Sequence, residues 1–178
     1  MEKTLICLLH AQTDSHGNLY KTAQGKLEEL AVVLRPFVSA STRWLHDGVR
    51  PGINTIVALA PHFGISVTRE ELEDDIAAVE SGEEVKAQQV VWLPSLESDN
   101  PQAPHRSELE LVRNELFAHL SNHGSMLACM GEQFYRCFFQ FLAGTQYAGQ
   151  LNGGDAIVLR LAESGTSLVL VNTQRLTV

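Results

Sequence analysis

Apolar and polar residues alternate along this chain in blocks that have the lengths of strands and helices. Residues 4–9 form a continuous apolar run that ends at His10, as expected for a strand buried on both faces. Apolar residues in 26–34 and 107–120 instead recur at helical spacing. The pattern predicts further strands at 43–46, 89–93, 126–130, 156–161 and 167–172, and helices at 26–34, 53–62, 68–86, 107–120 and 133–142.

Local signals mark the ends of several of these elements. Thr22 is placed to cap the first helix, and Pro36 ends it. Thr68 followed by Glu71 has the form of a capping box, which predicts a solvated helix in the acidic segment that follows. The Asp-Gly pair after residue 46 predicts a turn between the second strand and the second helix.

Strands and helices alternate over most of the sequence, and two strands with a turn at 164–165 close it. This order predicts one α/β domain over residues 1–178, in three α/β/α layers. The central sheet is expected to be mostly parallel, with helices on both faces and a C-terminal antiparallel hairpin. The acidic segment 68–89 is interpreted as an insertion. Ligands of such sheets bind beyond the carboxyl ends of the strands, here at His10 and at residues 130–132.

Charge and cysteine content limit the classes of function. The 178-residue chain has 13 Lys and Arg against 21 Asp and Glu, a formal net charge of −8. Without a basic run, neither nucleic acid nor an anionic membrane is expected as a partner. The three cysteines have no metal-like spacing and lie among apolar residues. No apolar run has the length of a membrane span, and the N-terminal stretch is interpreted as a strand rather than a signal peptide, so we expect a cytoplasmic protein.

The first strand and the residues after it carry a family pattern. Residues 8–13 (LLHAQT), Asn18 and residues 22–25 (TAQG) resemble the opening of the histidine phosphatase superfamily, which includes the phosphoglycerate mutases. That family begins with a strand that runs into Arg-His-Gly-Gln-Thr and continues with Asn and Leu-Thr-x-x-Gly. Residues 125–141 resemble its later strand, Ser-His-Gly run and apolar helix. The nearest branch in length is that of the small phosphohistidine phosphatases, whose Leu-Pro-Glu-Leu run resembles residues 92–96 (WLPSL).

The resemblance assigns roles to individual residues. It places His10 at the position of the nucleophile that accepts the phosphoryl group, and Arg50 at that of the second phosphate-binding arginine. Gln12 and Thr13 follow the nucleophile and are expected to lie at the phosphate. In the family, two arginines and a second histidine hold the phosphoryl oxygens, and an acidic residue protonates the leaving group.

Several positions depart from this pattern. Leu9 stands where the first arginine is expected, and Met130 where the second histidine is expected, so neither can hold an anion. Ser95 stands at the acid position, with Glu97 as a displaced substitute. Glu132 places a carboxylate at the start of a helix, where it would repel a phosphate dianion. Loss of one preorganised donor typically lowers a rate about 10²–10³-fold, so the pattern indicates a dismantled phosphatase site.

These departures lead to three hypotheses. The first is a catalytically degenerate protein that binds a ligand, such as a phosphorylated small molecule or a phosphoprotein, or a protein partner through the former phosphate cleft. The second is an active phosphatase of phosphohistidine or small phosphomonoesters that uses His10, with His46, Arg43 or Arg106 replacing the missing donors. The third is an assembly role in which a basic partner docks on the acidic residues 70–84.

No metal and no cofactor are expected. His119 and His123 lie four residues apart on one predicted helix, but the motif has no third ligand. The glycine-rich loop 144–154 lacks the Lys and Ser or Thr of a P-loop and is interpreted as a connection. The acidic residues 70–75 lack the spacing of an EF-hand.

Overall fold

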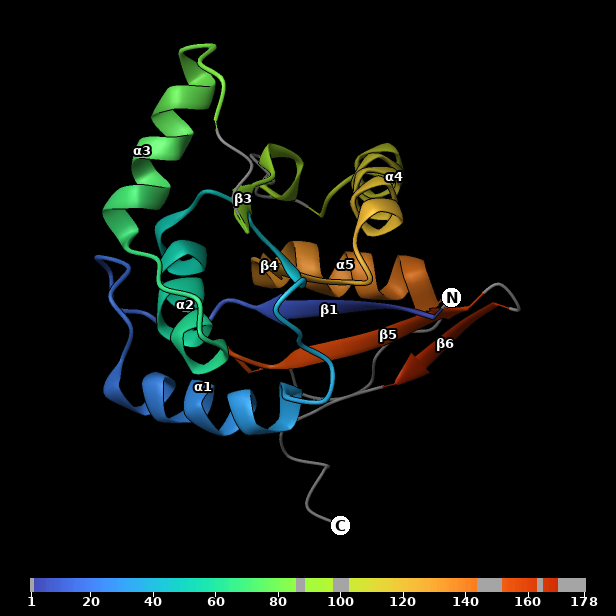
Figure 1. Cartoon of the computed structure of the whole chain (residues 1–178), viewed down its shortest axis with the longest axis horizontal. Helices are drawn as coiled ribbons and strands as arrows, with labels where there is room; N and C mark the ends of the chain where they lie inside the picture. Colours follow the sequence, from blue (N-terminus) through green and yellow to red (C-terminus); the bar gives the residue numbers. More distant parts are fainter. Residues whose placement is uncertain (1, 86–88, 98–102, 144–151, 163–164, 170–178) are drawn as a thin grey trace.

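A central sheet runs through the molecule and carries helices on both faces (Figure 1). The computed structural model describes residues 2–85, 89–97, 103–143, 152–162 and 165–169. Over these residues the sheet has six strands in the order β3-β2-β4-β1-β5-β6. The strands are β1 (Lys3–Leu9), β2 (Arg43–His46), β3 (Val90–Trp92), β4 (Ser125–Met130), β5 (Ala156–Ala162) and β6 (Gly165–Val169).

Neighbouring strands pair in the directions that the sequence predicts. β3, β2, β4 and β1 are parallel to one another, and β5 and β6 follow as antiparallel strands. β1 lies between β4 and β5, with Leu9 opposite Met130 on one side and Leu8 opposite Ala156 on the other. Because β1 is paired on both edges and covered on both faces, its apolar run is uninterrupted. The predicted fold class is confirmed.

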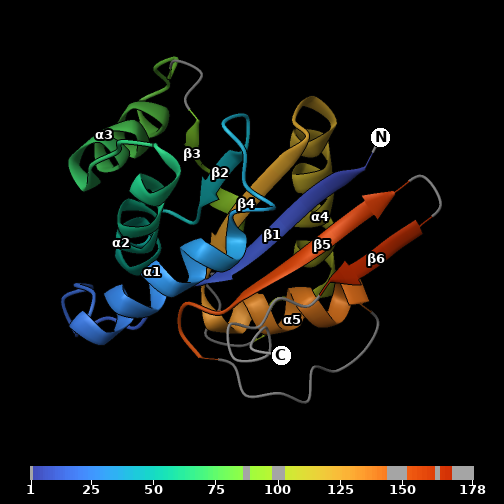
Figure 2. The ribbon, with the colours of Figure 1, turned by 60° about the horizontal axis from the view of Figure 1, so that its bottom comes forward.

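Two layers of helices cover the sheet (Figure 2). Helices α1, α2 and α3 pack on one face, and α4 and α5 pack on the other. Each layer closes a hydrophobic core of its own against the sheet. The bounds are α1 Lys21–Leu34, α2 Arg50–Leu59, α3 Arg69–Glu80, α4 Arg106–Asn122 and α5 Glu132–Ala143, with short 3-10 helices η1 (Ala60–Phe63) and η2 (Pro94–Leu96).

The side chains of β1 alternate between these two cores. Ile6 and Leu8 are buried in the same cluster as Leu27 of α1. Leu5 and Leu9 are buried in the cluster that the α4 and α5 side chains form. Full burial of such a side chain stabilises the fold by about 1.5–3 kcal/mol. Leu9, the last residue of β1, is therefore part of a core.

The start of α1 differs from the prediction. The helix begins at Lys21 rather than Lys26, so Thr22 lies in its first turn and does not cap it. The capping position is Tyr20, whose side chain makes no capping hydrogen bond. The Tyr20 carbonyl instead accepts from the Gln24 backbone N–H at 3.1 Å, which closes the first helical turn. The predicted stop holds, since the helix ends at Leu34, before Pro36.

The second helix is longer at its start and tighter at its end than expected. α2 begins at Arg50, because Pro51 fits the first turn, where a missing N–H has no cost. The residues predicted to continue the helix to His62 tighten into η1. That turn ends at Gly64, whose φ of 75° requires a glycine-like conformation.

The acidic helix α3 has the capping box that the sequence predicts. The Thr68 hydroxyl accepts from the Glu71 backbone N–H at 3.2 Å, and the Glu71 carboxylate accepts from the Thr68 N–H at 2.8 Å. Leu72 is the single buried residue of this helix, which confirms a solvated element. The helix ends at Glu80 and not at 86, and Gly82 with φ of 76° follows it.

Some predictions fall outside the described residues. These are the loop residues 144–151, Ser164 of the predicted turn and the last residues of the final strand, 170–172. Within the described ranges, no helix is both long and apolar enough to cross a bilayer. The cysteines Cys7, Cys129 and Cys137 are unpaired. The interpretation of 68–89 as an insertion stays a prediction.

Replacing Thr68 by Ala removes the acceptor of the Glu71 N–H. We expect the free energy of unfolding to fall by about 1 kcal/mol, measured by urea denaturation. Ser81→Ala, at the other end of α3, is the control, because its exposed hydroxyl only donates to the Ala77 carbonyl at 2.8 Å. That change should cost less than about 0.5 kcal/mol. Equal losses in both variants would contradict a specific role for the cap.

Candidate functional site

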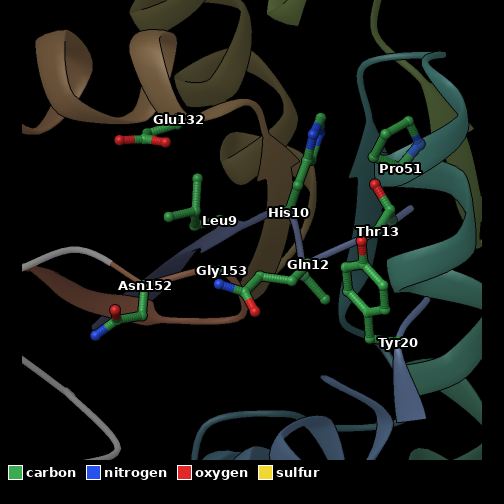
Figure 3. Close-up of a pocket in the computed structure, with 10 residues that line it drawn as sticks. Leu9, His10, Gln12, Thr13, Tyr20, Pro51, Glu132, Asn152 and Gly153 are labelled. Atoms are coloured by element: carbon green, nitrogen blue, oxygen red, sulfur yellow. The ribbon is translucent and has the colours of Figure 1, made fainter. Parts of the chain in front are cut away.

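A cleft of about 560 Å³ opens beyond the carboxyl ends of β1 and β4, the edge at which parallel sheets bind ligands (Figure 3). His10 points into it, Gln12 extends toward Asn152, and Glu132 lies on the same side as Leu9 (Figure 3). The lining residues are Leu9, His10, Ala11, Gln12, Thr13, Tyr20, Pro51, Glu132, Asn152 and Gly153. The cleft therefore combines residues from distant parts of the sequence.

Backbone hydrogen bonds fix the position of His10. Its N–H donates to the Met130 carbonyl at 3.0 Å, which continues the β1–β4 pairing by one residue. The next N–H, of Ala11, donates to the Thr55 hydroxyl at 3.0 Å, and that hydroxyl donates to the Pro51 carbonyl at 2.6 Å. The start of α2 is thus tied to the end of β1. The His10 side chain is 14% exposed.

The His10 ring lies against a buried carboxylate. Its Nε2 atom is 2.6 Å from Oδ2 of Asp47, whose side chain is 3% exposed. Asp47 follows β2, as His10 follows β1, and the other carboxylate oxygen accepts from the Val49 N–H at 3.2 Å. The sequence predicts the turn at this position, and the turn is confirmed. The contact with His10 was not predicted.

Gly52, in the first turns of α2, leaves the space that this contact needs. A Cβ atom at position 52 would lie 2.4 Å from Oδ1 of Asp47 and 2.8 Å from Nε2 of His10. Gly131, on the β4 side, is less crowded, because a Cβ there would lie 3.7 Å from Cε1 of His10. The pair of side chains therefore depends on glycine at position 52.

A smaller hollow of about 250 Å³ adjoins the cleft and shares His10 and Glu132 with it. Asp47 and Glu97 also line it, so three carboxylates and one imidazole share this hollow. Glu132 is paired with the exposed Arg136 one turn later in α5, at 2.7 Å. Among the described residues, neither the cleft nor the hollow is lined by a lysine or an arginine.

A turn before β5 forms another wall of the cleft. The Gly154 N–H donates to the carbonyls of Leu9 and His10, each at 3.1 Å. Lys26 of α1 donates to the Gly153 carbonyl at 2.9 Å and pairs with Asp155 at 2.8 Å. The nearest lysine on this side is thus already bound by the turn. It holds the wall in place rather than facing the cleft.

The fold matches that of solved phosphatases. The protein histidine phosphatase SixA, complexed with tungstate, has a TM-score of 0.65 and 14% identity over 99% of this chain and 100% of that chain. Mycobacterial glucosyl-3-phosphoglycerate phosphatase Rv2419c has a TM-score of 0.59 and 14% identity over 97% and 99%. A phosphoserine phosphatase mutant from Entamoeba histolytica, in complex with phosphoserine, has a TM-score of 0.59 and 12% identity over 99% and 100%. No family model matches the chain, and no curated protein matches it.

This chain has the histidine phosphatase fold. The match confirms, at the level of the fold, the resemblance to the phosphoglycerate mutase-like superfamily near the SixA branch. His10, predicted at the nucleophile position, follows the last residue of β1 and lines the cleft. Gln12 and Thr13, predicted at the phosphate, also line the cleft.

The two apolar residues predicted at donor positions, Leu9 and Met130, lie side by side in the sheet. Leu9 and Met130 are partners in the β1–β4 register and belong to the α4/α5 core. Met130 is fully buried, and Leu9 also borders the cleft. Their side chains offer no hydrogen bond donor to an anion. Both side chains contribute to the packing of that core.

Arg50 stands at the predicted arginine position but lies outside the cleft lining. Its exposed guanidinium donates to the His16 carbonyl at 3.3 Å. Its aliphatic carbons lie close to Gly17, where a Cβ would come within 2.8 Å of Cδ of Arg50. Pro51, the next residue, lines the cleft instead. Arg50 would have to leave this loop to reach a ligand at His10.

The other residues predicted as the acid or as replacement donors lie at different places in the structure. Ser95 donates to Glu115 and does not line the cleft, whereas Glu97 lines the adjoining hollow. Arg106 pairs with Glu110 at 3.1 Å on an exposed face of α4. Neither Arg43 nor His46 lines the cleft or the hollow. Apart from Glu97, which shares the hollow with His10, the structure does not bring these groups to His10.

The His119 and His123 pair lies far from this chemistry, on α4 and just after it. Burial lowers the pKa of His119, followed by the effects of nearby Arg43 and His123, so its charged form is disfavoured. Among the described residues, no group of three His, Cys, Asp or Glu side chains is arranged to hold a metal ion. Burial also raises the pKa of Cys7 to about 12, so that thiol is unreactive.

Gly52→Ala should force the His10 and Asp47 side chains apart. We expect a loss of about 1–3 kcal/mol in the free energy of unfolding, because the new methyl group has no space. Gly25→Ala, in α1, is the matched control, since nothing lies within 4 Å of its Cβ position. That variant should gain up to about 1 kcal/mol. An unchanged His10 ring resonance in a stable Gly52→Ala protein would refute this crowding.

His46 should make the fold acid-sensitive. Burial lowers its pKa from 6.5 to about 4, partly offset by Asp47, and its Nδ1 accepts from the Gly48 N–H at 3.1 Å. The unfolded chain binds this proton near pH 6.5 and the folded chain near pH 4, so stability should fall as the pH drops between these values. The loss approaches about 3 kcal/mol at the lower end.

Urea denaturation at several pH values between 4 and 7 measures this effect. His46→Gln should flatten the pH dependence of the free energy of unfolding in that range. His62→Gln, which changes an exposed histidine, should leave it as in the wild type. Parallel curves for the wild type and His46→Gln would show that other groups cause the acid sensitivity.

Proposed function

We propose that this protein is a catalytically degenerate histidine phosphatase-like protein that binds a ligand or a protein partner through the cleft at His10. One observation carries the proposal: in the part of the chain that the structure describes, no lysine or arginine lines the cleft or the adjoining hollow. A phosphate monoester is nearly dianionic and requires several charged donors for tight binding and for transfer. His10 alone does not supply them.

The charges around His10 support the same proposal. Asp47, Glu97 and Glu132 place carboxylates at the cleft and the hollow, and carboxylates repel a phosphate dianion. The other polar side chains of the cleft are neutral: Gln12, Thr13, Tyr20 and Asn152. These groups donate and accept hydrogen bonds, which suits a polar ligand group that is uncharged or positively charged. A phosphorylated ligand would have to place its phosphate away from His10.

An active phosphatase is the second candidate, because His10 remains at the nucleophile position and lines the cleft. SixA and the phosphoserine phosphatase, which share the fold, are phosphatases by name. For this chain to act on phosphohistidine or a small phosphomonoester, Arg50 would have to turn from the His16 carbonyl into the cleft. Such a movement would bring one cationic donor to His10 and would still leave the donors at the Leu9 and Met130 positions missing.

Two further expectations belong to the proposal. A cytoplasmic location is supported by the unpaired cysteines Cys7, Cys129 and Cys137. A basic protein partner at residues 70–84 is supported by the mostly exposed surface of α3. The exposed Val79 lies within the same segment.

Hydrolysis assays test the proposal directly. An aryl phosphate and a phosphohistidine peptide are incubated with the wild type and with His10→Ala, beside an active SixA-type phosphatase. We expect equal, background rates in the two proteins, at least about 10⁴-fold below the active enzyme, because several donors are missing. Turnover in the wild type that disappears in His10→Ala would overturn the degenerate assignment and favour the phosphatase.

A further inference from the structure

We infer that Asp47 is the residue that keeps phosphoryl groups away from His10, because its carboxylate occupies the place that an incoming oxyanion would need. The inference rests on the proposed function and deepens it, since it names the side chain that sets the ligand class of the cleft. Leu9 and Met130 stand at positions where two predicted donors are missing. Asp47 adds a carboxylate in direct contact with Nε2 of His10.

The geometry leaves no room beside Nε2. With Oδ2 of Asp47 at 2.6 Å, no further heavy atom fits between the imidazole and the carboxylate. The adjacent Cε1–Nδ1 edge of the ring faces Gly131, where a Cβ would lie 3.7 Å from Cε1 and 3.9 Å from Nδ1. A phosphoryl group that approaches Nε2 must therefore displace Asp47.

The turn after β2 holds Asp47 in this position. Oδ1 accepts from the Val49 N–H at 3.2 Å, and the Asp47 carbonyl accepts from the Trp92 indole N–H at 3.3 Å. Gly48 has φ of 86°, and a Cβ on it would lie 2.5 Å from Nε1 of Trp92. A side chain at position 48 is thus excluded by the Trp92 ring. Displacing the carboxylate requires breaking its hydrogen bond with the Val49 N–H.

On the α2 side, Gly52 leaves the space that the Asp47 carboxylate occupies. A Cβ there would lie 2.4 Å from Oδ1 of Asp47, so any other residue at position 52 would push the carboxylate from its place. Asp47 is also 3% exposed, which limits the screening of its charge by water. A buried carboxylate in contact with the imidazole repels an anion more strongly than an exposed one nearby.

Glu132 provides a matched comparison. It lines the adjoining hollow together with Asp47, but it is 62% exposed and already paired with Arg136 at 2.7 Å. Removing its charge alters the net charge of the hollow by the same amount as removing that of Asp47. The two positions therefore separate a specific block at Nε2 from a general effect of negative charge.

The test measures tungstate and inorganic phosphate binding by isothermal titration calorimetry. Asp47→Ser removes the charge and opens space, while its hydroxyl can still accept from the Val49 N–H in the turn. We expect its tungstate affinity to rise at least about tenfold over the wild type, since like charges in contact oppose binding by more than that factor. Asp47→Asn keeps the volume and should gain less. Glu132→Gln should stay within about threefold of the wild type.

The double variant His10→Ala, Asp47→Ser shows where the anion binds, and it should lose the gain. Thermal unfolding confirms that each variant is folded, and Asp47→Asn serves if Asp47→Ser is not. No gain in a folded Asp47 variant, an equal gain in Glu132→Gln, or a gain that persists without His10 would each overturn the inference. The hydrolysis rates of the wild type decide the proposed function separately, so the two failures are distinguishable.

Discussion

The pairing of β1 with β4 determines where every group of the cleft lies. Its register sets Leu9 beside Met130, and the next hydrogen bond fixes His10 over the end of β4. The same strand end receives the turn before β5 through the Gly154 N–H. A shift of this register by one residue would exchange the β1 side chains between the two cores. The position of His10 is thus a consequence of core packing in two layers.

That dependence explains how the fold persists while the chemistry of the site changes. Leu9 and Met130 lie at the cleft end of the sheet, yet both also belong to the α4/α5 core. Apolar side chains at these positions add buried surface to that core, and under the proposed function no catalytic demand opposes this. Asp47 fills the space next to His10, and Gly52 leaves room for both side chains.

Most of the fold was predictable from the sequence, because the apolar run of β1, the helical spacing in α4 and the Thr68 cap act locally. The errors fell where local signals compete. Thr22 is a good capping residue, but the chain had already turned into the helix at Tyr20. The place of Arg50 outside the cleft lining could not be read from the sequence for a different reason. Its side chain donates to the His16 carbonyl, a contact between the start of α2 and a distant loop.

Asp47 illustrates the limit most clearly. Its role in a turn is readable from the Asp-Gly pair, but its distance from His10 depends on the order of three strands. The rule that strand ends converge at one edge of a parallel sheet, applied to β2 as well as to β1 and β4, would have marked it. No sequence pattern of this kind indicates that position 52 must lack a side chain to leave room for Asp47 and His10.

The central place of β1 also affects how this chain folds during synthesis. Its hydrogen-bonding partners, β4 and β5, begin more than 115 residues later in the sequence. β1 therefore leaves the ribosome long before either of its pairing partners, and its edges stay unpaired in the meantime. Long sequence separation of this kind slows folding and exposes intermediates to aggregation. The nascent chain should therefore depend on chaperones until β5 has emerged.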